Sequence, residues 1–148
     1  MANLPGSILF ACDRNTIRSP MAAAIMRHIA GQRVYVDSAG VEPDENGPDG
    51  FAVAAMQEVG LDIATHHPKG FDEVGDGSVD LIIAFTPQAK DRAAEFTRTL
   101  ACDVEYWPVA LPAEVSGSRE ARLQAYREVR EALFSHIRAR FAHSDAPV

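Results

Sequence analysis

Short apolar runs alternate along this chain with stretches in which apolar residues recur every three or four positions. The runs at 7–11, 33–40, 79–85 and 102–109 predict buried strands. The helical spacing predicts helices at 19–30, 51–59 and 87–99, and a long final helix that follows Gly117 and extends to Phe141. Strands that alternate with helices are typical of an α/β fold, with a parallel sheet covered by helices on both faces.

Length and composition narrow the class of protein. The 148 residues are 47% hydrophobic, which fits one domain spanning residues 1–148. No run approaches the roughly 20 apolar residues of a membrane span, and the first residues lack the basic and apolar regions of a secretory signal. We therefore expect a soluble, cytoplasmic protein. The formal net charge of −7 argues against nucleic acid and anionic membranes as partners.

The stretch CDRNTIRSP, residues 12–20, carries the strongest chemical signal. Cys12 ends an apolar strand, and Pro20 suits the first turn of a helix, with Ser19 before it as the expected cap. A loop that leads into a helix start presents backbone N–H groups to an anion. Arg18 adds a guanidinium that can hold two oxygens of a phosphate at once. Such positive surroundings favour the thiolate form of Cys12, a nucleophile that Ser19 can stabilise with a hydrogen bond.

With this motif in this place, the sequence resembles the low-molecular-weight protein tyrosine phosphatase family, which also includes thiol-dependent arsenate reductases and protein-arginine phosphatases. The likeness covers nearly the whole chain, through the segments CDRNTIRSPMA, VDSAG, GLDIATHHPK, VDLIIAF and YWPVALPA. It implies a three-layer α/β/α fold with a four-stranded parallel sheet and a phosphate loop between the first strand and the first helix. It also implies a phosphocysteine intermediate, with no metal or organic cofactor.

The resemblance assigns roles to particular residues. Cys12 matches the nucleophile, Arg18 the oxyanion clamp and Ser19 the stabiliser of the thiolate. Asn15, Ser38 and His66 match positions that support the loop. The residues expected to surround the phosphate are Asp13, Arg14, Asn15, Thr16, Ile17 and Arg18.

The sequence departs from the family pattern at two positions. Ile17 stands where many of the phosphatases carry a second, protective cysteine. Leu111 stands where the family has the aspartate that protonates the leaving oxygen, and leucine cannot transfer a proton. Because general acid catalysis contributes about 10²–10⁴ in rate, this change should weigh against poor leaving groups. Glu114, in the same loop, is the first candidate for a substitute acid, and Asp13, Asp103 and Glu105 are further carboxylates to consider.

The leading hypothesis is a phosphatase that acts through Cys12 on a phosphotyrosine-like phosphomonoester, in a phosphorylated protein or a small phosphoester, with low activity. Inorganic phosphate and sulfate are expected ligands of the same loop. The alternatives are a thiol-dependent arsenate reductase, a non-catalytic oxyanion or phosphoprotein binder, and, from Thr16, a protein-arginine phosphatase. The adjacent pair His66 and His67 has no cluster of further ligands, so no metal site is expected.

Overall fold

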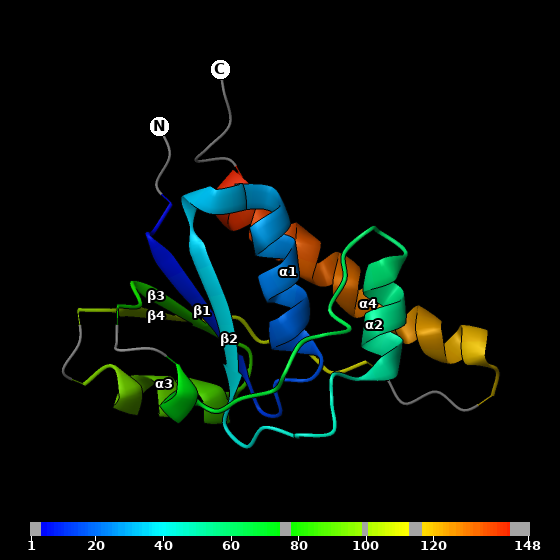
Figure 1. Cartoon of the computed structure of the whole chain (residues 1–148), viewed down its shortest axis with the longest axis horizontal. Coiled ribbons are helices and arrows are strands. Elements are labelled where there is room, and N and C mark those ends of the chain that lie inside the picture. The colour runs from blue at the N-terminus through cyan, green and yellow to red at the C-terminus, as the bar shows by residue number, and fades with distance from the viewer. Residues whose placement is uncertain (1–3, 75–77, 99–100, 113–116, 143–148) are drawn as a thin grey trace.

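The computed structural model describes residues 4–74, 78–98, 101–112 and 117–142. They contain one sheet of four strands, β1 (Ser7–Cys12), β2 (Tyr35–Gly40), β3 (Leu81–Ala84) and β4 (Asp103–Tyr106). The spatial order is β2-β1-β3-β4, and every neighbouring pair is parallel (Figure 1). The predicted four-stranded parallel sheet is confirmed, although β4 is shorter than the expected 102–109. The expectation of a single domain over residues 1–148 stays a prediction.

Four α-helices lie in the described residues, at the places in the chain that the periodicity predicts. They are α1 (Arg18–Ala30), α2 (Gly50–Gln57), α3 (Pro87–Phe96) and α4 (Arg119–Ile137), and α4 continues as a π-helical segment, Arg138–Ala142. The start of α1 differs from the expectation. The helix begins at Arg18, its N-cap is Ile17, and no side chain caps it. Ser19 therefore lies inside the helix, which frees its hydroxyl for another partner.

The side chains of the strands alternate between two apolar layers, because successive residues of a strand point to opposite faces. Ile8 and Phe10 belong to the layer that α1, α2 and α4 complete. Leu9 and Ala11 face the other way, toward a smaller layer completed by α3. All of these side chains are at most 1% exposed. The result is a sheet between two layers of helices, as predicted.

The strand order places a crevice at one end of β1. The chain runs from β1 to β2 on one side and then crosses to β3 on the other, so connections leave the carboxyl ends of β1 and β3 in opposite directions. In open α/β sheets, ligands bind at such a switch point. The segment 12–18, called the phosphate loop below, connects β1 to α1 at this place.

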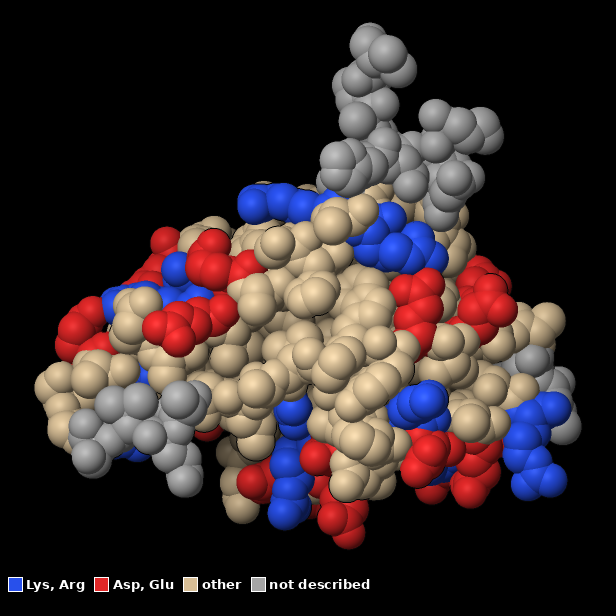
Figure 2. Space-filling view, turned by 180° about the vertical axis from the view of Figure 1, so that it is seen from behind, with Lys and Arg blue, Asp and Glu red and all other residues tan. Residues whose placement is uncertain are grey.

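Charged side chains of both signs are mixed on the surface (Figure 2), as expected from a sequence with 14 basic and 21 acidic residues. On the face seen in Figure 2, Lys and Arg side chains lie among Asp and Glu side chains and form no continuous basic surface. Within the described ranges, no helix is both long enough and apolar enough to cross a membrane.

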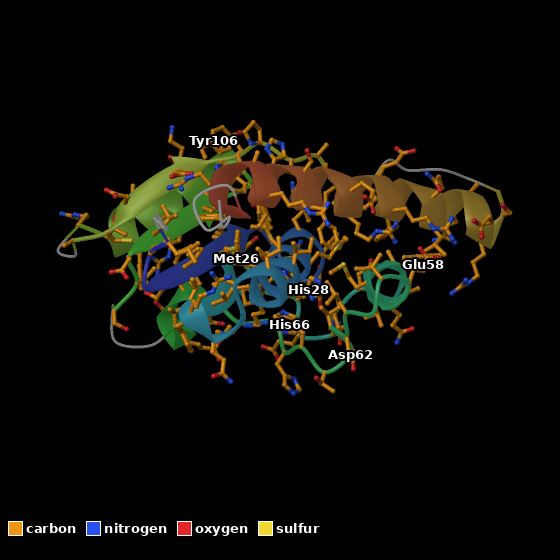
Figure 3. The ribbon with its side chains drawn as sticks, turned by 90° about the horizontal axis from the view of Figure 1, so that it is seen from above. Met26, His28, Glu58, Asp62, His66 and Tyr106 are labelled. Atoms are coloured by element: carbon orange, nitrogen blue, oxygen red, sulfur yellow. The ribbon has the colours of Figure 1, made fainter. Side chains whose placement is uncertain are left out.

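Both ends of α2 are tied to α4. At its start, the Asp49 carboxylate accepts hydrogen bonds from the first turn of α2 and from the hydroxyl of Tyr126. At its end, Glu58 lies between α2 and α4 (Figure 3). Its carboxylate accepts hydrogen bonds from Arg127 and Arg130 on α4, and these bonds lower the pKa of Glu58 to about 2. The segment 41–49, which leads into α2, is thereby held in place next to the phosphate loop.

Candidate active site

The carbonyl groups of residues 12–16 in the phosphate loop point outward. Every carbonyl from residue 12 to residue 16 accepts a hydrogen bond from the surrounding structure, four of them from backbone N–H groups of the segment 41–49. The pairs are Val41 to Cys12 (3.0 Å), Glu42 to Asp13 (2.8 Å), Asp44 to Arg14 (3.1 Å), Asp49 to Thr16 (3.1 Å) and, from its ring Nε2, His66 to Asn15 (2.9 Å).

This arrangement fixes the direction of the N–H groups. In a trans peptide the C=O of one residue and the N–H of the next point in opposite directions. Because the carbonyls of residues 12–16 turn outward, the N–H groups of residues 13–17 turn toward the centre of the loop. Converging N–H groups ahead of a helix start form an anion-binding cradle. The backbone of the acidic segment 41–49 therefore shapes this cradle.

Asn15 is the hub of the loop. Its φ of 60° is left-handed, a conformation that asparagine tolerates better than most residues. The Lys69 N–H donates to its Oδ1 (2.9 Å), which identifies the other side-chain atom as the NH₂ group. That group donates to the hydroxyls of Ser19 (2.8 Å) and Ser38 (3.0 Å). The side chain thus joins the loop to β2, to α1 and to the segment that contains Lys69.

Cys12 and Ser19 are brought together by the same network. The sulfur of Cys12 lies 2.9 Å from the Ser19 oxygen, and both residues are at most 2% exposed. Since the Ser19 oxygen already accepts from Asn15, its own proton is free to be donated to the sulfur. A donated hydrogen bond of this kind stabilises a thiolate, both as it attacks and as it leaves.

Arg18 is buried at the mouth of the loop with part of its guanidinium unpaired. One terminal nitrogen donates to the Val109 carbonyl (2.7 Å), in the segment that follows β4. Its Nε is buried and has no hydrogen-bond partner among the described residues. A buried donor without an acceptor costs about 1–3 kcal/mol, and an oxyanion in the loop is an acceptor that would remove this cost.

A cavity of about 210 Å³ opens over the nucleophile. Its lining residues are Cys12, Asp13, Arg14, Thr16, Ile17, Arg18 and Leu111. The first six belong to the phosphate loop, and Leu111 comes from the segment after β4, with an exposed side chain. Leu111 therefore lies at the site, as its match to the acid position predicts. Glu114, the first candidate for a substitute acid, lies outside the described residues.

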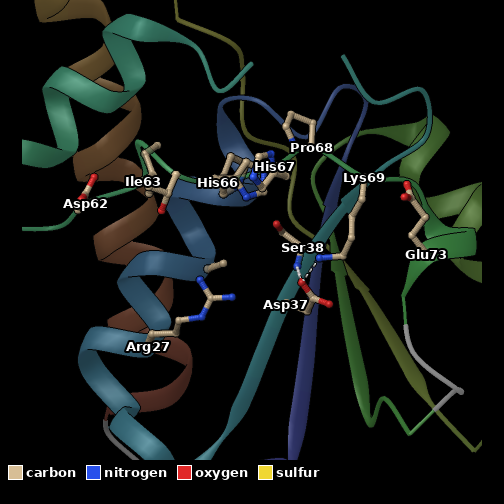
Figure 4. A pocket seen from close by; sticks show the side chains of 13 residues that line it. Arg27, Asp37, Ser38, Asp62, Ile63, His66, His67, Pro68, Lys69 and Glu73 are labelled. Carbon is tan, nitrogen blue, oxygen red and sulfur yellow. Dashed lines mark hydrogen bonds and ion pairs between the residues drawn. The ribbon is translucent and has the colours of Figure 1, made fainter. Parts of the chain in front are cut away.

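The side of the loop away from this cavity is supported by polar residues. Lys69 forms an ion pair with Asp37, and Ser38 and His66 contact Asn15. These four line a separate, larger cavity of about 440 Å³ that contains no residue of the loop (Figure 4). Burial lowers the pKa of His66, although its hydrogen bond to the Asn15 carbonyl works against this. A neutral ring that donates from Nε2 to that carbonyl fits the contact.

A further contact crosses the switch point. The Thr86 hydroxyl donates to the Asp13 carboxylate at 2.7 Å, while its oxygen accepts from the N–H of Ala89 and caps α3. No pattern in the sequence indicates this contact, because it depends on β3 lying beside β1. The contact of the Lys69 N–H with Asn15 and the close packing of Gly40 against the loop backbone depend on the fold in the same way. The available signals in the sequence are a glycine that ends a predicted strand and a lysine three residues after His66.

Two of the other carboxylates considered from sequence are not at the site. Asp103 is the first residue of β4, so it lies at the amino ends of the strands, whereas the phosphate loop follows the carboxyl end of β1. Glu105 accepts hydrogen bonds from Arg140 (2.8 Å) and Trp107 (3.0 Å). Burial acts to raise the pKa of Glu105, but these bonds outweigh it, and the net shift is downward.

Cys102 is also far from Cys12. The strand register pairs Ile8 with Leu81 and Leu81 with Asp103, so Cys102 lies near the start of β1 while Cys12 ends it. At about 3.3 Å per residue the two cysteines are separated by more than ~13 Å along the strands, well beyond the roughly 7 Å limit between the Cα atoms of a disulfide. Cys102 cannot serve as a redox partner of Cys12 in this fold. No group of three or more His, Cys, Asp or Glu side chains in the described part of the chain is arranged to hold a metal ion.

Comparison with known proteins identifies the class that this fold and loop define. The model of the low molecular weight phosphotyrosine protein phosphatase family matches residues 7–141. The chain belongs to this family, whose relatives include cysteine-dependent phosphatases and arsenate reductases.

Individual relatives point to more than one activity. An arsenate reductase of Bacillus licheniformis is 30% identical over 138 residues, which cover 93% of this chain and 96% of that protein. A crystal structure of a YwlE mutant from Bacillus subtilis has a TM-score of 0.77 and 26% identity, covering 96% of this chain and all of that one. A YwlE arginine phosphatase mutant with a phosphorylated active-site serine has a TM-score of 0.72 and 28% identity, covering 89% and 91% of the two chains.

Proposed function

We propose that this protein is a phosphatase that hydrolyses a phosphomonoester through a phosphocysteine at Cys12. The observation that carries the proposal is the hydrogen bonding of every carbonyl from residue 12 to residue 16 to groups outside the loop, beside a buried cysteine and an unpaired Arg18 Nε. Carbonyls held in this way turn the N–H groups of residues 13–17 inward. These donors suit a tetrahedral oxyanion, and the charge that builds on its oxygens during transfer is what they would stabilise.

The chemistry follows from the placement of the groups. The Cys12 thiolate, held by the Ser19 hydroxyl, attacks phosphorus, and an S–P bond forms as the P–O bond to the leaving group breaks. Arg18 and the loop N–H groups bind the three remaining oxygens throughout. Water then attacks phosphorus, the S–P bond breaks, and inorganic phosphate and the thiolate are released. Inorganic phosphate should therefore bind the free protein and compete with substrate.

A second candidate, a thiol-dependent arsenate reductase, is supported by two observations. Relatives with that name are 28–30% identical over most of the chain. The expelled oxygen of arsenate also carries its own proton in the protonated anion, so Leu111 would cost such a reaction less than it costs ester cleavage. Because Cys102 cannot reach Cys12, the reductant would have to be an external thiol.

The test compares substrates on one enzyme preparation. Purified protein is given p-nitrophenyl phosphate, a phosphotyrosine peptide, phosphoarginine, or arsenate with a small thiol, and phosphate or arsenite is measured. We expect turnover of the aryl phosphate with a burst of one leaving group per active site, and none by Cys12→Ser. Phosphoarginine tests the alternative that Thr16 and the arginine phosphatase likeness raise. Turnover of arsenate alone would replace the phosphatase proposal with the reductase, and phosphate binding without any turnover would indicate a binder.

A further inference from the structure

The position at which the family supplies the leaving-group proton holds Leu111, yet a residue with a carboxyl group lines the cavity. Among the described residues that line it, Asp13 is the only acidic one. Asp13 follows the nucleophile directly and is half-buried. Asp103 lies at the amino ends of the strands, away from the phosphate loop, and Glu105 accepts hydrogen bonds from Arg140 and Trp107.

The Asp13 side chain is held by one of its two oxygens. Thr86 donates to Oδ1 at 2.7 Å, and Thr86 is itself fixed as the N-cap of α3 through the N–H of Ala89. The Asp13 carbonyl is fixed as well, by the N–H of Glu42. A carboxyl group anchored at Oδ1 keeps Oδ2 available for a proton. The contact bridges the carboxyl ends of β1 and β3, the place where this fold binds ligands.

We infer that Asp13 is the general acid of the phosphatase reaction and that Thr86 positions it. This inference rests on the proposed function. As the Cys12 thiolate forms the S–P bond, the P–O ester bond breaks and the Asp13 carboxyl transfers its proton to the departing oxygen. In the second step the Asp13 carboxylate takes a proton from the attacking water, the S–P bond breaks, and the thiolate and inorganic phosphate are released. The acid is regenerated in each cycle.

A proton donor and a residue with a merely structural role have different effects on the kinetics. A proton donor matters most when the departing oxygen is basic, so its loss affects phenyl phosphate far more than 2,4-dinitrophenyl phosphate. A residue that only shapes the loop affects both esters alike. The ratio kcat/KM is the quantity to compare, because it covers every step up to the departure of the leaving group.

The experiment measures kcat/KM for both esters in four variants of the full chain. Asp13→Asn, which keeps an acceptor for Thr86, should lose about 10²-fold or more on phenyl phosphate and little on 2,4-dinitrophenyl phosphate. Thr86→Val should show a weaker form of the same selective loss on phenyl phosphate. Thr86→Ser, which keeps the hydroxyl, should have kcat/KM values close to those of wild type. Glu45→Gln, an exposed carboxylate of the neighbouring segment, is the control for charge and should resemble wild type.

Three results would overturn the inference. Equal losses of kcat/KM on both esters in Asp13→Asn would show that Asp13 has only a structural role. Unchanged or faster cleavage of phenyl phosphate by this variant would show that Asp13 donates no proton. The same leaving-group-dependent loss in Glu114→Gln, but not in Asp13→Asn, would place the acid at 114. Failure of the proposed function looks different, because wild type would then cleave neither ester, or Cys12→Ser would retain activity.

Discussion

Gly40 and Asn15 lie so close that a Cβ atom at position 40 would stand 2.8 Å from the Asn15 backbone nitrogen. The same atom would stand 2.9 Å from the Asp13 carbonyl oxygen. The last residue of β2 thus packs directly against the backbone of the phosphate loop, and only a residue without a side chain fits there.

Substituting Gly40→Ala should displace the loop while leaving the sheet intact. A shift of about 1 Å in catalytic groups can cost on the order of 10² in rate, so we expect a loss of that size in kcat/KM with p-nitrophenyl phosphate, together with weaker inhibition by inorganic phosphate. Gly50→Ala is the matched control, because no atom lies within 4 Å of a Cβ built there. Equal activity of the two variants would contradict the close packing of the loop.

How much of this site the sequence can predict depends on how local each feature is. The strand, the loop and the helix around Cys12 follow from adjacent residues, and their order is confirmed. The role of Ser19 as a cap was wrong, because Asn15 and Cys12 engage its hydroxyl from within the loop. Its expected hydrogen bond to the sulfur, which both the motif and the resemblance suggested, agrees with the contact between the two side chains.

Features that depend on strand order were beyond prediction. The contact between Asp13 and Thr86 joins residues 73 positions apart and exists only because β3 lies beside β1. The outward carbonyls of the loop likewise depend on where the segment 41–49 passes. The sequence of this segment does not reveal that role, because hydrogen bonds made by backbone atoms leave little trace in side-chain identity.

The side chain and the backbone of Asn15 can be tested separately. Asn15→Gly keeps the left-handed conformation but leaves Ser19 and Ser38 without their donor, whereas Asn15→Ala also strains the backbone at φ 60°. Both variants should lose turnover. Only Asn15→Ala should carry an additional loss of stability, about 1–2 kcal/mol, measured as a lower thermal midpoint. Wild-type turnover in Asn15→Gly would show that the side-chain network is dispensable.

The two cysteines should differ in reactivity with pH. Burial, together with the carboxylates of Asp103 and Asp80, raises the pKa of the Cys102 thiol. A raised pKa keeps Cys102 protonated through neutral pH, so its alkylation should become fast only in alkaline solution. Cys12, whose thiolate the Ser19 hydroxyl stabilises, should react first near pH 7, and phosphate should protect it. Peptide mapping after iodoacetate treatment across a pH series measures both rates, and preferential labelling of Cys102 in the native protein would contradict the assignment.

Stability in acid should depend on Glu58. Hydrogen bonds from Arg127 and Arg130 hold the pKa of Glu58 near 2, below the roughly 4.3 of an unfolded glutamate. Because the folded value is the lower one, the contribution to the free energy of unfolding is fully present above about pH 4.3 and is lost as the pH falls toward 2. Glu58→Gln should lower the thermal midpoint at pH 7 and lose this part of the acid dependence. Glu128→Gln, which changes an exposed carboxylate, is the control. Identical acid profiles of the two variants would show that Glu58 does not contribute to the pH dependence of stability.

The last prediction concerns Leu111, which lines the same cavity as Asp13 from the opposite segment. If Asp13 supplies the proton, Leu111→Asp adds a second donor to a site that already has one, and phenyl phosphate should gain little in the wild-type background. In Asp13→Asn the same substitution meets a site without a donor, and kcat/KM for phenyl phosphate should recover by about 10-fold or more, since general acid catalysis supplies about 10²–10⁴. With 2,4-dinitrophenyl phosphate neither background should respond, because that leaving group departs without a proton. The non-additivity of the two substitutions measures whether the residues serve one role. A gain of the same size in both backgrounds would show that Asp13 supplies no proton, and no gain in either would show that position 111 does not reach the leaving oxygen.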